Sequence, residues 1–459
     1  MTVPATGSEG GRLAALRRRY DPLLTKLRGS ETAKASWLAG AMMANNVIAL
    51  GSTVVFARLL GANYGSLAAL VSYFLILAVA GYAMQVATAR EAVLGHLGVG
   101  PGLAATARSW TRAILIFTVA MSVLSVLFRQ PIADAVGVKD EAWAAALGLP
   151  AGCLYLLLTI LRGVLQGTGD YRTVGISLIG EQTVRLIIGA MLALAGLGVT
   201  GAYLGTPLSF VAMSLYCMFM IHREIGVPLP GQGAALSLWL HVKRAWAPIA
   251  ALAVIAVLQN IDIIAAKHRF TKDVASSYSA TAVAAKVVIW VAMGAGFYLV
   301  PEVSRRRAAG EDTRPVLVRS LLIIAAVAVP CLLIFAAVPH LLLELAFGKA
   351  RATASDSLII LGLAFTMLAA TYLAIQYMLA LRRFWFLIVL AAVAVAEPIF
   401  LLNASQKPAG FAAVVLGVQA VGALLAFGIA LRRSGPPPDR DATPPEEAEA
   451  AATATPELV

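Results

Sequence analysis

The chain has 459 residues, of which 60% are hydrophobic and 13% charged, and its formal net charge is +12. Soluble domains are about 45–50% apolar, so this composition excludes an ordinary soluble enzyme or binding module. The three cysteines, Cys153, Cys217 and Cys331, lie inside apolar blocks without metal-ligand spacing. They are therefore expected to be small buried hydrophobes, not metal ligands.

Twelve apolar blocks follow one another along the chain. A helix needs about 20 apolar residues to cross the roughly 30 Å hydrocarbon core, and lipid offers the backbone no hydrogen bonds, so each block is expected to be helical. The sequence thus predicts an all-α polytopic membrane protein with about 12 transmembrane helices. The blocks are Trp37–Ala57, Tyr64–Ala89, Ala113–Phe128, Ala142–Leu161, Val174–Gly196, Gly201–Ile221, Ala245–Ala266, Tyr278–Val300, Leu317–Val338, Ser357–Leu381, Phe384–Leu402 and Gly410–Leu431.

The blocks divide into two groups of six, one within 36–221 and one within 245–431, joined by a linker at 222–244. Residues 1–35 form a basic N-terminal arm, expected to be either an amphipathic helix on the membrane surface or an unstructured segment. No cleavable signal peptide is expected in it. Residues 432–459 are rich in proline and glutamate, which predicts a disordered tail.

The basic residues are distributed unevenly between the two sides of these helices. With a cytoplasmic N-terminus, the cytoplasmic side holds 25 of the 36 Lys and Arg, counting Arg319 at the inner end of its block; the outer loops hold 9, and 2 lie deeper within the blocks. The positive-inside rule then places both termini of a multi-pass inner-membrane protein in the cytoplasm. The positive charge is explained by topology and by contact with anionic membrane lipids, so no nucleic-acid partner is expected.

The two groups of blocks share sequence features. In the first group, Tyr64 is followed by an apolar block and then Arg90; in the second, Tyr278 is followed by one and then Arg305. Because each group contains an even number of blocks, two such repeats have the same orientation in the membrane. Parallel repeats of this kind are typical of transporters whose substrate site lies between the two halves.

Several junctions between blocks resemble those of bacterial polysaccharide exporters. The segment 56–65 resembles their ARLLGxxxYG junction, 163–172 resembles GxLQGxGxxR, and Glu181–Gln182–Thr183–Val184–Arg185 is similar to their ExxxR helix. The segments 262–267 and 301–305 resemble the corresponding junctions of the second half. On these motifs the chain resembles the multidrug/oligosaccharidyl-lipid/polysaccharide (MOP) superfamily, in its polysaccharide-transporter branch.

The resemblance implies two six-helix bundles around a central cavity. It also implies a transporter that flips undecaprenyl-pyrophosphate-linked oligosaccharide from the inner to the outer leaflet by alternating access, for surface polysaccharide biosynthesis. Partners would be the lipid-linked substrate, membrane lipids, and a glycan polymerase or glycosyltransferases. No cofactor is implied beyond coupling to Na⁺ or H⁺.

Five ionisable residues lie inside the blocks, where each costs about 2.5–3.5 kcal/mol without a partner or a wet cavity. Glu181 and Arg185 are spaced i,i+4 and share one helix face. They form either a structural pair or a substrate site in which Arg185 binds phosphate, because a guanidinium fork suits phosphate oxygens. Arg90 is a further candidate for substrate binding, at a basic cavity mouth with Arg162 and Arg172, although these arginines also serve topology.

The second half contributes Lys286, Asp262 and Glu397. Lys286 and Asp262 lie on adjacent antiparallel blocks at similar depth, which predicts either a structural ion pair or a pyrophosphate-binding Lys286 beside an ion-coupling Asp262 and Asn260. Glu397 precedes Pro398 in a block, and a carboxylate beside a helix kink is a candidate for proton uptake. The substrate hypothesis requires Arg185 and Lys286 to face one shared groove.

Two other functions compete with the flippase. A MATE-type multidrug antiporter that exports cations fits the two cations and three anions of the blocks, but not the junction motifs. A membrane-embedded glycan ligase or polymerase would need catalytic side chains in outer loops, where the sequence offers only His268 and His340. The sequence also lacks a Walker A motif, so the chain is expected not to be an enzyme.

Overall fold

The computed structural model describes residues 31–229, 231, 233–381 and 383–431. The N-terminal arm up to residue 30 and the tail from 432 therefore lie outside the described residues. Eight stretches of the described chain are long and apolar enough to cross a membrane, and two of them, Trp37–Val93 and Tyr171–Glu224, each contain two successive helices. The predicted all-helical polytopic architecture is confirmed.

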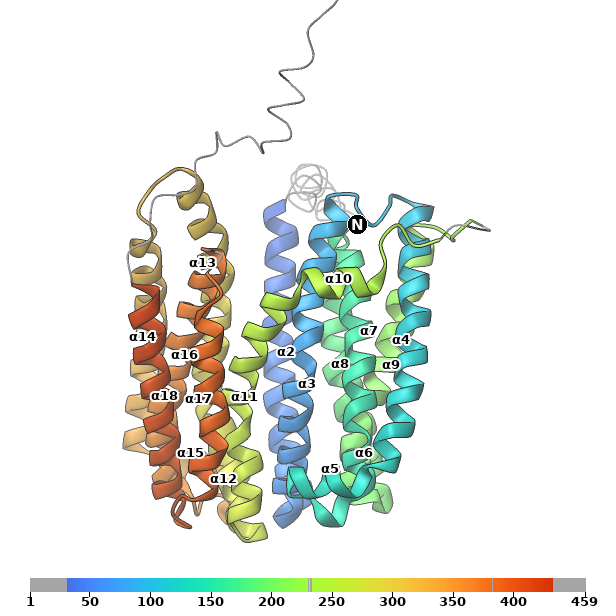
Figure 1. Ribbon diagram of the computed structural model, residues 1–459. Coiled ribbons are helices and arrows are strands. Elements are labelled where there is room, and N and C mark those ends of the chain that lie inside the picture. Colours follow the sequence, from blue (N-terminus) through green and yellow to red (C-terminus); the bar gives the residue numbers. More distant parts are fainter. Residues whose placement is uncertain (1–30, 230, 232, 382, 432–459) are drawn as a thin grey trace, which may run out of the picture.

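The first six passes form one bundle, the N-lobe, on the right of Figure 1. Its helices run alternately down and up, and short helices cover their ends at the lower face of the figure. The N-lobe helices are α2 (Glu31–Leu60), α3 (Tyr64–Val93), α4 (Pro101–Leu127), α5 (Arg129–Val136), α6 (Ala142–Ala146), α7 (Gly148–Gly167), α8 (Tyr171–Leu192) and α9 (Gly198–Glu224).

The second six passes form the C-lobe on the left of Figure 1. Its order of long and short helices repeats that of the N-lobe, as two parallel repeats require. The short helix α15 follows the third pass of the C-lobe, as α5 follows the third pass of the N-lobe. The C-lobe helices are α11 (Trp246–Arg269), α12 (Lys272–Ala285), α13 (Val287–Ala308), α14 (Arg314–Ala337), α15 (Pro339–Phe347), α16 (Leu358–Ala380), α17 (Phe386–Leu402) and α18 (Pro408–Ala430).

Burial separates central from peripheral helices. The most apolar windows of the stretches holding α7 and α16 are each 67% buried, whereas those of α4 and α14 are 22% buried. Leu115, Phe117 and Leu322 project from these two peripheral helices and are exposed. An apolar helix with an exposed apolar face is suited to lipid, so α4 and α14 form the outer, lipid-facing edges of the two lobes.

Three of the differences between the helix bounds and the sequence prediction involve charged residues. Helix α4 begins at Pro101, twelve residues before the predicted block, because Arg108 and Arg112 are accommodated in its upper turns. Helix α7 ends at Gly167, so Arg162 lies inside a pass and not beyond its end. The eighth pass is divided at Lys286 into α12 and α13.

The linker contains a helix that the sequence did not predict, α10 (Leu238–Arg244). His241 of α10 is buried, stacks on the Trp110 ring at 4.8 Å between centroids, and lies 3.1 Å from the hydroxyl of Thr88. The Trp110 indole also donates to the carbonyl of Leu236 over 2.9 Å. The linker is therefore docked on α3 and α4, crossing the upper half of the molecule toward α11 (Figure 1).

The two lobes meet at the lower face. There the start of α3 packs against α11 and α12, and the turn Gly61–Asn63 contacts α12. Hydrogen bonds from Arg58 and Ser276 cross between the lobes at this face. At the upper face, helices α13 and α2 stand apart from each other in Figure 1.

Candidate functional site

Arg162 is a buried cation at the centre of the N-lobe. Its guanidinium donates through Nε to the Ser177 hydroxyl over 2.7 Å and through Nη2 to the Ser177 carbonyl over 2.8 Å. Its Nη1 lies 2.9 Å from Oε2 of Glu181, and its side chain is 0% exposed. Three contacts to one neighbouring helix make Arg162 a fixed clamp between α7 and α8.

Glu181 is shared between two arginines. Its Oε2 faces Arg162, and its Oε1 accepts from Nη2 of Arg185 over 3.2 Å. The predicted i,i+4 pair is thus confirmed, with the addition of the second guanidinium. These three residues, Arg162, Glu181 and Arg185, are the N-lobe cluster; one carboxylate against two guanidiniums leaves it with a formal charge of +1.

Arg185 is the less constrained of the two arginines. Its side chain is 14% exposed, and its buried Nε has no hydrogen-bond partner among the described residues. The guanidinium carbon lies 5.8 Å from the ring centroid of Phe74 and 5.4 Å from that of Phe210. Two aromatic faces hold the cation by cation–π attraction while leaving a hydrogen-bond donor free for an anion.

The C-lobe holds a cluster of opposite sign. Lys286, at the junction of α12 and α13, places Nζ 3.3 Å from Oδ1 of Asp262 on α11, so the predicted ion pair is present. The Lys286 ammonium also lies 5.2 Å from the Phe365 ring centroid. Tyr278 donates to the other Asp262 oxygen over 3.4 Å. Asp262 is 0% and the Lys286 side chain 8% exposed.

Glu397 completes this C-lobe cluster of Asp262, Lys286 and Glu397. It is 0% exposed in α17, one residue before Pro398, which lies inside the helix as predicted. Both of its oxygens accept from Nε2 of Gln419 on α18, over 3.1 and 3.3 Å. Gln419 also donates to the carbonyl of Leu258 over 3.0 Å. One ammonium against two carboxylates gives the cluster a formal charge of −1.

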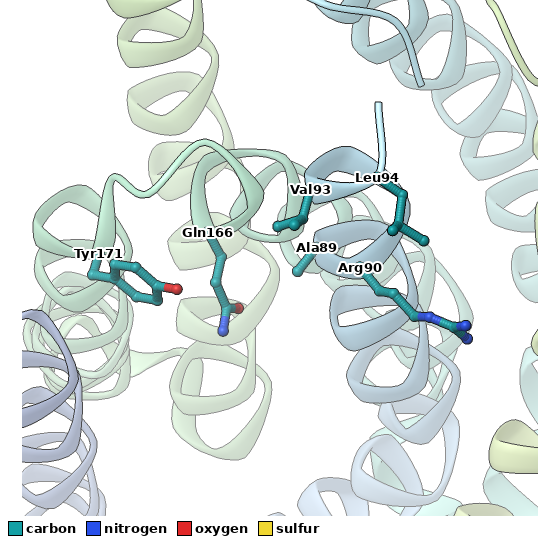
Figure 2. A pocket seen from close by; sticks show the side chains of 6 residues that line it. All are labelled: Ala89, Arg90, Val93, Leu94, Gln166 and Tyr171. Carbon is teal, nitrogen blue, oxygen red and sulfur yellow. The ribbon is translucent and has the colours of Figure 1, made fainter. Parts of the chain in front are cut away.

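Asn260 and Arg90 occupy different surroundings from the clusters. Asn260 is buried, and its amide donates to the carbonyl of Ala256 one turn earlier over 2.9 Å, which leaves its side-chain oxygen available as an acceptor. Arg90 is exposed near the upper end of α3. In Figure 2 its side chain points away from Gln166 and Tyr171, with which it lines a cavity of about 310 Å³ at the upper end of the N-lobe.

The structure places each of the two cations, Arg185 and Lys286, beside a carboxylate of its own lobe, and Lys286 also lies against the Phe365 ring. This geometry agrees with the ion-pair alternative for Lys286. That Arg185 and Lys286 face one shared groove stays a prediction. The charge balance changes too: with Arg162 inside the membrane, the six intramembrane charges sum to zero and are separated by sign between the lobes.

Sequence reasoning missed Arg162 as an intramembrane ligand of Glu181 and missed Gln419 as the partner of Glu397. The signal for Arg162 was present, since the apolar run continues after it through Gly163, Val164 and Leu165. Gln419 carried no comparable signal, because a single glutamine is common in an apolar helix. No group of three His, Cys, Asp or Glu side chains placed to hold a metal ion occurs within the described ranges.

Comparison by sequence finds no match, either among protein-family profiles or among curated proteins. Comparison by structure finds matches among solved transporter structures. A multidrug resistance MATE family transporter of the MOP superfamily, in an inward-facing conformation, matches with a TM-score of 0.68 and 13% identity, covering 84% of this chain and 93% of that chain. The chain has the fold of MOP superfamily transporters.

Two further solved structures refine this result. Lipid II flippase MurJ, in an inward closed conformation, matches with a TM-score of 0.67 and 15% identity, covering 85% of this chain and 87% of that chain. An outward-facing MATE transporter of the same superfamily matches with a TM-score of 0.53 and 14% identity, covering 88% and 96%. Drug transporters and a lipid flippase thus share this fold.

Proposed function

We propose that the protein flips a lipid-linked oligosaccharide, carried on a polyprenyl pyrophosphate such as undecaprenyl pyrophosphate, across the bacterial inner membrane by alternating access. The charged head of such a substrate cannot cross hydrocarbon unaided. A protein that shields it while the prenyl tail stays in lipid lowers the barrier without covalent chemistry. The product would supply surface polysaccharide biosynthesis, with a glycan polymerase or glycosyltransferases acting before and after it.

The observation that carries this proposal is the surplus cation of the N-lobe cluster. Glu181 has one oxygen on Arg162 and the other on Arg185, and Arg162 alone balances its charge. Arg185 therefore has a charge without its own counter-ion and an Nε without an acceptor among the described residues. A phosphate group would satisfy both, since guanidinium–phosphate bonds are charge-assisted and bidentate.

The orientation follows from the basic residues. Helices α3 and α7 end at the upper face, and the linker crosses there. This face corresponds to the side with 25 of the 36 Lys and Arg, so we assign it to the cytoplasm. The lower face, where the lobes meet, is then the outer one. Contact between the lobes at the outer face supports an inward-facing state, ready to accept substrate from the inner leaflet.

We assign ion coupling to the C-lobe cluster, through Asp262 and Glu397 with the free side-chain oxygen of Asn260. Its formal charge of −1 suits a cation, either Na⁺ or H⁺. The substitution Asp262→Asn should weaken the dependence of transport on that ion. A variant whose transport responds to Na⁺ and to pH as the wild type does would exclude Asp262 from coupling.

The test of the flippase proposal uses the purified protein in liposomes that contain lipid-linked oligosaccharide. Movement between leaflets is measured as loss of glycan accessibility to a membrane-impermeant lectin. Wild-type protein should move the glycan, Arg185→Ala should not, and Arg185→Lys should recover part of the rate, because it keeps the charge but not the fork. An Arg185→Ala variant that inserts normally and transports at the wild-type rate would remove the phosphate-ligand role.

The alternative function is a MATE-type antiporter that exports cationic amphiphiles. The observation that favours it is the anionic C-lobe cluster, together with the MATE structures that share the fold. The same liposomes decide between the two when loaded with a fluorescent cation and given a Na⁺ or H⁺ gradient. Cation transport without glycan movement would establish the antiporter and overturn the flippase.

A further inference from the structure

The lobes meet through helix packing, with α11 and α12 of the C-lobe against α3 of the N-lobe, and through a few hydrogen bonds at the lower face. Arg58, at the end of α2, donates through Nη2 to the carbonyl of Leu345 over 2.5 Å and through Nε to that of Ala346 over 3.3 Å. Ser276 of α12 donates to the carbonyl of Gly61 over 3.2 Å. These three hydrogen bonds all end on main-chain acceptors of the other lobe.

Arg58 occupies the end of a C-lobe helix. Leu345 and Ala346 belong to the last turn of α15, which ends at Phe347. The last carbonyls of a helix lack partners within it and carry the negative end of its dipole. A guanidinium from the N-lobe therefore caps a C-lobe helix, and this cap exists only while the lobes touch.

Gly65 lies where the backbones of the two lobes come close together. A Cβ at this position would lie 3.0 Å from the backbone nitrogen of Ser276 and 3.2 Å from its Cα. These atoms are main chain and cannot turn aside as a side-chain tip can. Gly65 and Ser276 are both buried, so the first turn of α3 and the first half of α12 pack backbone against backbone.

Two further polar contacts cross between the lobes at the rim. Lys272 lies 2.9 Å from Asp140, and the His268 ring lies 3.0 Å from the carbonyl of Ala135. The ion pair is exposed on both sides, at 62% and 75%, and exposed pairs contribute little to stability. The rim ion pair alone is therefore too weak to hold the lobes together.

We propose that the lower face contains a gate that is closed when the backbones of Gly65 and Ser276 are in contact. Arg58 is the latch of this gate, because its hydrogen bonds hold the two lobes together. The inference rests on the alternating-access function proposed above, in which this face must open to release substrate. Because the latch consists of hydrogen bonds to exposed helix-end carbonyls, water can replace the guanidinium when the lobes part. Because Gly65 has no side chain where it meets the Ser276 backbone, closure depends on a residue without a Cβ at position 65.

The test measures the distance between the lobes by pulsed electron paramagnetic resonance, on full-length protein in nanodiscs without substrate. Spin labels are attached at Lys139→Cys and Thr271→Cys, one exposed site on each lobe at the lower face, after replacement of the three native cysteines. Gly65→Val should lengthen this distance, since the valine methyls cannot fit against the Ser276 backbone. Gly51→Val is the matched control, because a Cβ at Gly51 on α2 meets nothing within 4 Å.

Arg58→Ala provides a second, independent variant, since Arg58 is exposed and its loss leaves the packing of α2 intact. It should reduce the fraction of molecules with the short distance, whereas Arg90→Ala at the upper end should not. A short-distance population unchanged in both Gly65→Val and Arg58→Ala overturns the gate. If Gly65→Val does not fold, the result for Arg58→Ala decides alone.

The outcome separates this inference from the proposed function. A gate that opens in Gly65→Val, in a protein whose wild type moves no lipid-linked glycan in liposomes, overturns the flippase and leaves the gate. Normal glycan flipping by a wild type whose Gly65→Val and Arg58→Ala variants both keep the short distance overturns the gate and leaves the flippase. If both hold, Gly65→Val should reduce flipping to the background of empty liposomes.

Discussion

The two lobes repeat one architecture but carry opposite charge at their centres. The N-lobe cluster surrounds one carboxylate, Glu181, with two arginines, whereas the C-lobe cluster holds one ammonium, Lys286, paired with Asp262, and a second carboxyl group, Glu397, hydrogen-bonded to Gln419. The two repeats therefore share their helices but not the charges at their centres. Under the proposed function this difference divides the work: the N-lobe cluster binds the anionic substrate and the C-lobe cluster the coupling cation.

The clusters also differ in how their surplus charge is held. In the N-lobe the surplus cation, Arg185, is partly exposed and has an unsatisfied donor. In the C-lobe the surplus acid, Glu397, is fully buried, with both oxygens on Gln419. The proposed anion site thus keeps a donor without a partner among the described residues, whereas the acid of the proposed cation site already has its hydrogen bonds.

The largest expected effect comes from removing the clamp of the N-lobe cluster. Arg162→Ala takes away three contacts and leaves Glu181 buried with a single, weaker partner. Breaking a buried ion pair from one side costs about 3–5 kcal/mol. The melting temperature in detergent should fall far more for Arg162→Ala than for Arg185→Ala. Equal losses in the two variants would show that the arginines are not divided into a clamp and a ligand.

The C-lobe cluster should behave as a true pair in a double-mutant cycle. Lys286→Met leaves Asp262 and Glu397 without a counter-ion and should destabilise the protein by about 3–5 kcal/mol. Adding Asp262→Asn removes one of the two charges and should recover about 0.5–3 kcal/mol of coupling energy. The measurement is thermal unfolding of both single variants and the double variant. Additive losses would mean that Lys286 and Asp262 are neighbours without energetic coupling.

The smallest expected effect concerns the linker, which is docked on the N-lobe. Burial lowers the pKa of His241 from its ordinary value; Glu91 raises it and Arg244 lowers it further. Released His241 thus takes up a proton at higher pH than docked His241, so docking should be strongest above the ordinary histidine pKa and weaken as pH falls below it. Amide hydrogen exchange in α10 should be faster at pH 5 than at pH 7.5. His241→Gln should lose this difference; a wild type with equal exchange at both values would contradict the argument.

Much of the fold could be predicted because bilayer thickness and the absence of hydrogen bonds in lipid restrict each apolar block to one structure. Pairs within one helix or between successive helices were equally predictable: Glu181 with Arg185 by spacing, and Lys286 with Asp262 by depth. The assignment of Arg162 failed because an arginine near the end of an apolar run satisfies the positive-inside rule as well as a buried pair does. Whether Arg185 and Lys286 face one groove could not be derived in the same way, because the rotation of each helix in its bundle is set by packing, which sequence spacing does not encode.

The most direct test of the central claim, that Arg185 holds the surplus positive charge that binds phosphate, is the affinity of the purified protein for farnesyl pyrophosphate. It is measured by calorimetry for the wild type, Arg185→Gln and the control Arg112→Gln, since Arg112 is exposed on α4. Loss of a charge-assisted contact worth about 1.5–3 kcal/mol should raise Kd about tenfold to a hundredfold in Arg185→Gln and leave Arg112→Gln unchanged. An Arg185→Gln variant that binds as tightly as the wild type would contradict the account.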